Sequence, residues 1–393
     1  MVEGDAETTP FWPFSRLNAL EVAPALARAP GGDPVRPVRL ASGGHAWLVT
    51  GHDAAQFVLT DPQFRMGVPG LGTDFATSGD LVHRFLDPPD HNFLRKLVSA
   101  RFSRQRVLEL EPRMTEIASS LLDVIAEGGP PADLVERFAL PFSIAILGEV
   151  LGVPPTRFPE LKAWSDALIS IPFADTAERT SGWRRLRPWL TELIAEKRRT
   201  GGVDVLSSLI RARDEHSESL TEEELLAFVA ILIPPGYLLT STVISWGVIL
   251  LAGEEGLGHA EVTQGMVEEI LRFQLAGGDV ARVATEEVAL CGTRVRAGDK
   301  VIVALSAVNR DSRLFTDPAS FKVDRKQNAH LAFGHGIHYC LGAGLARVEL
   351  QVALDMLFKR FPGIRLAEPI EELTFERSDL FGDELVTRLP VVW

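Results

Sequence analysis

The chain has 393 residues, of which 46% are hydrophobic and 24% charged, so it can bury a large core. Its formal net charge of -13 argues against a nucleic-acid backbone or an anionic membrane as a partner, because both bind patches of Lys and Arg. Only two cysteines occur, Cys291 and Cys340, too few for a disulfide scaffold, which predicts a reducing cytoplasmic location.

Short strands are expected near the N-terminus. The first residues, "MVEGDAETTPFWPF", are acidic and lack the apolar core of a secretory signal. The segments "PVRPVRLA" and "HAWLVTG" then predict two strands around a Gly-Gly turn, and a helix is expected from about His52. The stretch "RMGVPGLGTDFATSGD" has no periodicity and predicts a long functional loop.

Helical spacing dominates from Asp87 to about Leu251, with breaks at "EGGPPAD", "GVPPTRF" and "RTGGVD". Strands return within "EEVALCGTRVRAGDKVIVAL", and a last helix is expected from about Gly342 to Phe361. No repeat or linker separates independent domains. These patterns predict one mainly helical domain over residues 1–393 with small β-sheets.

The central stretch from Leu225 to Gly253 is uncharged and long enough to cross a bilayer. Its acidic flanks and its polar residues favour instead a helix buried inside the protein. The stretch contains Pro234 and Pro235, each of which costs about 3 kcal/mol in an undisturbed helix. Two such residues predict either a functional distortion or a purely structural kink.

The segment "FGHGIHYCLG" places Cys340 between a glycine-containing loop and the start of the last helix. A thiolate there meets the positive end of the helix dipole and free N–H groups, which suits a thiolate that holds an iron. Gly334 and Gly336 allow the backbone to pass close to a flat cofactor. The alternatives are a buried free cysteine and a zinc site of His335, His338 and Cys340, which lacks a fourth ligand.

The ten residues from Phe333 to Gly342 match FGxGxHxCLG, and so resemble the haem-binding signature of the cytochrome P450 superfamily. "EILR", Glu269 to Arg272, resembles the family's structural ExxR pair, and the segments Asp87–Ser103 and Asn309–Arg325 resemble two further parts of it. The resemblance covers nearly the whole chain and is to the soluble bacterial type without a membrane anchor. It implies the triangular-prism fold, with haem between the long central helix and the Cys loop.

The resemblance also implies haem b, iron protoporphyrin IX, with Cys340 as the iron ligand. His91 and Arg95 are four residues apart, share a helix face and can reach one anionic partner. In the resemblance, Arg282 and His338 occupy the family's other propionate-contact positions. Four donors are then available for the two haem propionates. The implied cofactor-binding residues are His91, Arg95, Arg282, Phe333, Gly334, His338, Cys340 and Gly342.

The central helix departs from the family pattern [AG]Gx[DE]T, whose acid and alcohol distort one turn and relay protons. In this chain the acid has become Leu238 and the alcohol Leu239, neither of which can donate or accept. Thr240 lies one residue late, about 100° around the helix. The residues aligned with the catalytic turn, including that late threonine, are Pro235, Gly236, Tyr237, Leu238, Leu239 and Thr240.

The prolines are interpreted as opening the turn that the acid and the alcohol otherwise keep open. Because they lack N–H groups, they free the carbonyls of Ala230 and Ile231 to bind water or substrate. Tyr237 either contributes a hydroxyl or faces away. Proton delivery is then expected from a group on the substrate, from hydrogen peroxide as the oxidant, or not at all in coupling, desaturation or rearrangement.

These features predict a monooxygenase-type haem-thiolate oxidoreductase that modifies a hydrophobic natural product in secondary metabolism. The alternatives are a peroxide-dependent or non-oxygenating haem enzyme and a non-catalytic homologue that stabilises a partner enzyme. The expected electron donors are a ferredoxin and its reductase, docking near Arg101, Arg104 and Arg347. The expected pocket lining is Arg65–Leu86, Pro234–Leu239, Leu275–Val280 and Leu380–Phe381.

Overall fold

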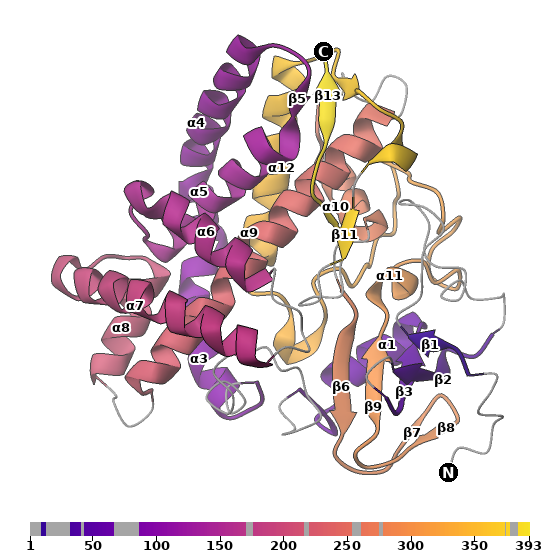
Figure 1. The fold of residues 1–393 in the computed structure, drawn as a ribbon. Coiled ribbons are helices and arrows are strands. Elements are labelled where there is room, and N and C mark those ends of the chain that lie inside the picture. Colours follow the sequence, from indigo (N-terminus) through magenta and orange to yellow (C-terminus); the bar gives the residue numbers. More distant parts are fainter. Residues whose placement is uncertain are drawn as a thin grey trace. The chain divides into compact units, whose positions relative to one another are not determined.

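The computed structural model (Figure 1) describes residues 9–12, 32–40, 43–66, 86–169, 176–215, 220–253, 261–274, 278–373, 375–377 and 384–393. The chain forms two compact units, each assembled from two stretches of sequence. The sheet unit comprises Met1–Thr73 and Glu268–Cys340, and the helical unit comprises Asp74–Val267 and Leu341–Trp393. The expectation of a single domain over residues 1–393 stays a prediction.

The helical unit contains the long helices of the chain. They are α3 (Asp90–Ser99), α4 (Arg104–Gly128), α5 (Leu140–Leu151), α6 (Phe158–Ile169), α7 (Thr176–Thr200), α8 (Val205–Glu215), α9 (Glu222–Gly253) and α12 (Ala343–Arg360). Short 3-10 and π turns precede or follow several of them, at Ala100–Phe102, Val135–Ala139 and Pro155–Arg157, and a further 3-10 turn lies at Ile370–Glu372. The three predicted breaks fall at the ends of α4, α5 and α7 and are confirmed.

Short strands complete the helical unit. β5 (Ala132–Asp133), β13 (Pro390–Val392) and β10 (Arg365–Leu366) form an antiparallel sheet, and β11 (Phe375–Arg377) pairs with β12 (Glu384–Val386). The ring of Trp246 on α9 stacks on Phe375, with centroids 5.6 Å apart. The hairpin is therefore held against the central helix of its own unit.

The central helix α9 continues through Pro234 and Pro235 without a break. It packs closely on α5 and α12, because a Cβ at Gly236 would lie 2.6 Å from Leu147 and a Cβ at Gly247 would lie 2.6 Å from Leu354. By length and composition α9 could cross a membrane, yet 61% of its most apolar window is buried within the protein. That burial agrees with the expectation of a core helix.

The sheet unit is built on a six-stranded sheet in the order β1-β2-β3-β9-β6-β4. These strands are β1 (Phe11–Trp12), β2 (Val35–Leu40), β3 (His45–Val49), β9 (Lys300–Val303), β6 (Val280–Ala284) and β4 (Phe64–Arg65). β2 and β3 are antiparallel, with Val35 opposite Val49, and β3 runs parallel to β9. A separate hairpin joins β7 (Val288–Leu290) to β8 (Thr293–Val295). The strands predicted in both regions are confirmed.

Two short helices and the end of a third complete this unit: α1 (His52–Thr60), α11 (Leu305–Val308) and α10 (Gln264–Phe273) from Glu268 onward. The predicted start of α1 at His52 is confirmed. Buried Val49, Val58, Phe64, Val303 and Leu331 belong to one apolar cluster that joins the sheet to α1 and to the chain before Cys340. Burial of this cluster fixes α1 in the unit.

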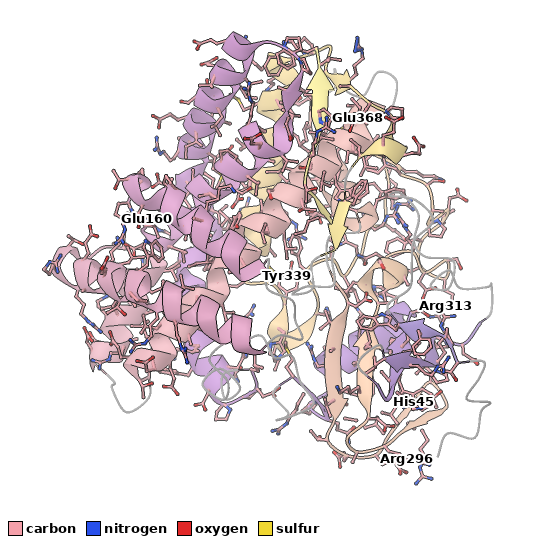
Figure 2. The ribbon with its side chains drawn as sticks, in the orientation of Figure 1. His45, Glu160, Arg296, Arg313, Tyr339 and Glu368 are labelled. Atoms are coloured by element: carbon pink, nitrogen blue, oxygen red, sulfur yellow. The ribbon has the colours of Figure 1, made fainter. Side chains whose placement is uncertain are left out.

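The N-terminus of α1 is capped from a distant part of the chain. Its N-cap residue is Gly51, which has no side chain to offer, and the backbone N–H of His52 donates instead to Oδ2 of Asp311 at 2.9 Å. Arg313, labelled in Figure 2, donates to the same oxygen at 2.7 Å. Burial alone would raise the pKa of Asp311, but these bonds outweigh it and bring the pKa to about 2.

Replacing Asp311 by Ala removes this cap and is expected to lower the free energy of unfolding by about 1 kcal/mol at pH 7. The folded-state pKa lies below the ordinary value, so the carboxylate stabilises the fold above about pH 4 and loses its effect as the pH falls toward 2. Thermal melts from pH 7 to pH 3 should show the gap between the two proteins narrowing. The control is Asp53→Ala, which removes an exposed carboxylate from the first turn of α1. An equal loss of stability in that variant would contradict the role of Asp311 as the cap of α1.

Candidate functional site

The loop that carries Cys340 is braced by its own backbone. The N–H of Cys340 donates to the carbonyl of Phe333 at 2.9 Å, and the N–H of Tyr339 donates to the carbonyl of Gly336 across a 3-10 turn at Gly336–His338. The Cys340 thiol is exposed, which rules out the alternative of a buried free cysteine. Helix α12 begins three residues later, at Ala343. A thiol is thus held on a fixed loop just before a helix N-terminus.

Two glycines give this loop its shape. Gly334 and Gly336 have φ angles of 70° and 71°, in the left-handed region that favours glycine. A Cβ on Gly336 would lie 2.5 Å from the carbonyl oxygen of Leu59, in the last turn of α1. Gly336 is therefore needed because the Cys340 loop passes close to the backbone of α1. The sequence alone instead predicts that this glycine makes room for a cofactor. A Cβ on Gly342 would meet nothing within 4 Å.

The side chains around the thiol suit a flat apolar group. Ile337 is 44% exposed and Tyr339 is 37% exposed (Figure 2), and the Tyr339 ring meets Phe333 edge-on at 6.3 Å. Among the described residues no group of three His, Cys, Asp or Glu could hold a metal ion, so His335, His338 and Cys340 form no zinc cluster there. A single soft sulfur ligand with apolar neighbours fits an iron porphyrin better than a bare ion.

The predicted propionate contacts lie in both units. Arg282 on β6 is only 3% exposed and donates to the carbonyl of Ala281 at 2.8 Å, and His338 lies partly exposed in the 3-10 turn. In the helical unit, His91 and Arg95 are both half-buried on α3. Burial lowers the pKa of His91 below its ordinary value. The hydrogen bond to Asn92 opposes this shift, and the positive charge of Arg95 reinforces it. His91 is therefore a neutral hydrogen-bond donor at pH 7.

Glu269 and Arg272 form the predicted pair, and both side chains are fully buried. Nε and Nη2 of Arg272 donate to the two oxygens of Glu269 at 2.8 and 2.7 Å. The same guanidinium donates to the carbonyls of Asn309, Pro318 and Ser320 at 2.9 to 3.1 Å. One side chain thus fixes three points of the segment that leads to the Cys340 loop.

A second guanidinium on Glu269 was missed by the sequence analysis. Nε of Arg325 donates to Oε2 of Glu269 at 2.9 Å, and the side chain of Arg325 is 6% exposed. Asn309 extends this network, because its Oδ1 accepts the backbone N–H of Leu331 at 2.7 Å, just before the loop. The only sequence signal was the basic residue that ends the Asn309–Arg325 segment.

Between Leu225 and Leu251, helix α9 leaves one stripe of its surface partly exposed, while its other residues in this range are buried. The exposed positions recur every three or four residues, as expected for one face of a helix. We call this set the open stripe. Its members are Phe228, Ile231, Leu232, Pro235, Gly236, Leu239, Thr240 and Val243.

The residues predicted at the catalytic turn divide between two faces of α9. Four of them, Pro235, Gly236, Leu239 and Thr240, belong to the open stripe. Tyr237 and Leu238 do not, since they are 0% and 8% exposed, and Tyr237 thus faces away from the stripe. The hydroxyl of Thr240 donates to the carbonyl of Gly236 at 3.3 Å.

The other predicted pocket segments fall largely outside the described residues. This applies to residues 67–85 of the long loop, to 275–277 and to both Leu380 and Phe381. Exposure is known for Pro234–Leu239 on α9 and, in the other predicted segments, for Arg65, Met66, Leu86 and Gly278–Val280. The role of the open stripe in binding stays a prediction.

Comparison with known proteins identifies relatives along almost the whole chain. A family model described as cytochrome P450 matches residues 254–369. The chain is 37% identical to nocardicin C N-oxygenase of Nocardia uniformis subsp. tsuyamanensis and 38% identical to mycinamicin IV hydroxylase/epoxidase of Micromonospora griseorubida, covering 97% of this chain and 98% of each relative. Among solved structures, the putative thioether synthase SgvP, involved in the tailoring step of griseoviridin, superposes with a TM-score of 0.89 at 34% identity, covering 98% of this chain and all of that one.

Replacing Glu269 by Gln should lower the free energy of unfolding by about 3 to 5 kcal/mol, because two buried guanidinium groups lose the carboxylate that they share. Urea denaturation measures the loss. The neighbouring Glu268→Gln variant is the control: Glu268 is partly exposed and contacts His330 at 3.0 Å, so a change below about 1 kcal/mol is expected. Similar losses in both variants would contradict the central role of Glu269.

Gly336→Ala should destabilise the protein by at least about 1 kcal/mol more than Gly334→Ala. Both substitutions place an alanine at a positive φ, which costs about 1 kcal/mol. Only the first also drives a Cβ against the backbone of Leu59. Equilibrium unfolding of the two variants makes the comparison, and equal losses would show that the approach to α1 is unimportant.

Proposed function

The chain belongs to the cytochrome P450 family and is a monooxygenase-type oxidoreductase, and we propose that it tailors a hydrophobic natural product with haem b bound through Cys340. The observation that carries the proposal is the exposed Cys340 thiol within a complete FGxGxHxCLG loop. Relatives that act on nocardicin C and on mycinamicin IV support a tailoring step in secondary metabolism. A cytoplasmic location is part of the same proposal.

Each set of residues has a defined task in this proposal. When bound, the iron porphyrin supplies the activation of dioxygen. The Cys340 thiolate provides its ligand, held in place by the loop hydrogen bonds and by the Glu269 network behind them. Arg282, Arg95, His338 and His91 would donate to the two propionates, and the two guanidinium groups would offset their charge.

The open stripe of α9 supplies the proposed substrate surface. It contains no charged side chain, and Thr240 is its only polar one. Such a surface suits a hydrophobic or mid-polarity molecule and discriminates against a highly charged metabolite. That preference agrees with the size and chemistry expected of a tailoring substrate.

Proton delivery in this enzyme is proposed to be non-standard. Leu239 holds the position of the family's alcohol, and Leu238 is both apolar and turned away from the open stripe. The Thr240 hydroxyl already donates to the carbonyl of Gly236, so it presents lone pairs to its surroundings. A proton must therefore come from the substrate itself, unless peroxide is the oxidant or the reaction consumes no relayed proton.

The proposed electron donors are a ferredoxin and its reductase. Arg101, Arg104 and Arg347 all belong to the helical unit, where Arg101 donates to Ser208 at 2.8 Å. Arg104 lies on an exposed turn of α4 that also presents Leu108, which is 49% exposed. Cationic groups beside an exposed apolar side chain form a suitable dock for an acidic protein.

Cys340→Ser is expected to abolish the thiolate band in the carbon monoxide difference spectrum of the reduced protein. The other cysteine, Cys291, is also exposed and lies in the turn between β7 and β8, so Cys291→Ser is the matched control and should keep the band. A band that survives in Cys340→Ser, or that the wild type lacks, would contradict the proposal.

The reaction itself is tested with a metabolite extract of the producing organism, incubated with the purified protein and followed by mass spectrometry. One incubation contains ferredoxin, its reductase and NADPH, and the other contains only hydrogen peroxide. A product with one added oxygen in the first alone supports proton delivery from the substrate. A product in the second alone assigns the enzyme to the peroxide-using class.

A further inference from the structure

The two prolines leave one carbonyl of α9 without any helical donor. In a helix the carbonyl of residue i accepts from the N–H of residue i+4, or of i+3 in a 3-10 turn. For Ile231 these two positions are Pro235 and Pro234, and neither has an N–H. The next N–H, of Gly236, stands at the α-helical position for Leu232. The carbonyl of Ile231 therefore has no N–H at either its 3-10 or its α-helical donor position.

The neighbouring carbonyl is in a different situation. Ala230 loses its i+4 donor to Pro234, but the N–H of Ile233 remains available at i+3. Ala230 and Pro234 also lie among the buried positions of α9. Of the two carbonyls affected by the prolines, only that of Ile231 lacks both helical donors.

The carbonyl of Ile231 lies on the open stripe. Ile231 and Pro235, the residues on either side of the missing hydrogen bond, are both partly exposed members of it. Nine residues further along the same stripe, about 13 Å away, Thr240 donates its proton to Gly236 and presents acceptor lone pairs. The polar atoms of the stripe are thus acceptors, in an otherwise apolar surface.

An acceptor in an apolar surface selects ligands that bring a donor. A ligand that covers the carbonyl without donating leaves it unsatisfied, which is costly, whereas an N–H or O–H group satisfies it. This asymmetry gives the stripe a preference that its apolar side chains alone do not have.

We propose that the carbonyl oxygen of Ile231 is a specificity-determining acceptor, and that the substrate is an apolar molecule with an N–H or O–H group that donates to it. The inference rests on the proposed function, because it assumes that the open stripe of α9 faces the substrate. It assigns to Pro234 and Pro235 the role of keeping that acceptor free.

The test uses matched probes that differ only in a donor: indole against 1-methylindole, and 4-phenylphenol against 4-methoxybiphenyl. Dissociation constants are measured from perturbation of the haem absorption band of the holoprotein. Pro235→Ala restores an N–H at the i+4 position of Ile231 and closes the acceptor. Pro234→Ala restores the i+4 donor of Ala230 and gives Ile231 an N–H only at the 3-10 position, which the continuous α-helix does not use, so it is the matched control. Pro235→Val restores the same N–H and keeps apolar bulk on the stripe.

The preference for the donor-bearing probe, expressed as the ratio of the two dissociation constants, should fall about threefold to tenfold in Pro235→Ala and Pro235→Val. It should stay near the wild-type value in Pro234→Ala. Because each ratio compares two probes in one protein, a change in pocket volume affects it little. An unchanged ratio in the Pro235 variants, an equal fall in Pro234→Ala, or no wild-type binding of either pair would overturn the inference.

The two proposals fail in different ways. If the wild type shows no thiolate band with carbon monoxide, the proposed function is wrong. If the band is intact in the wild type and in all three variants while the probe ratios do not move, only the role of the Ile231 carbonyl is wrong.

Discussion

The buried carboxylate of Glu269 is the interaction on which the Cys340 loop depends. Burying an ion costs several kcal/mol, and an ion pair repays this only when every remaining donor and acceptor is satisfied. Glu269 meets that condition because it accepts hydrogen bonds from two guanidinium groups. The remaining N–H groups of Arg272 donate to three backbone carbonyls. One of these belongs to Asn309, whose side chain holds Leu331 at the entrance of the loop. The geometry around the thiol is thus set by a network within the sheet unit.

Sequence patterns could predict the local half of this site. Glu269 and Arg272 are one helical turn apart, and the Cys340 loop is contiguous, so both leave a short recognisable signature. The partners that complete the site are remote: Arg325 meets Glu269 across 56 residues, and Asp311 caps α1 across 259. A hydrogen bond over such separations has no periodicity to detect. The requirement for glycine at position 336 could not be predicted from the sequence either, because it arises from the close contact of the Cys340 loop with Leu59 of α1.

The central helix shows how tertiary packing overrides propensity. Two prolines in a helix interior cost about 6 kcal/mol together, which would end an isolated helix. In α9 the cost is offset by burial of large side chains such as Ile233, Ile244 and Trp246, each worth about 1.5 to 3 kcal/mol. The helix therefore continues, and what remains of the proline effect is local. The sequence predicts a perturbation at the two prolines, but only the exposure pattern separates Pro235, on the open stripe, from buried Pro234.

The exposure pattern of α9 connects the choice of substrate with the source of protons. On the described part of α9, the open stripe offers acceptors and no side chain able to release a proton, since Leu239 replaces the alcohol and the Thr240 hydroxyl is engaged with Gly236. Under the proposed function, a chemistry that needs a proton draws it from a group that arrives with the substrate. An N–H or O–H group meets both demands, because it satisfies an acceptor on the stripe and carries a transferable proton. In this proposal, the leucines at the positions of the acid and the alcohol make the donor groups of the substrate part of the working site.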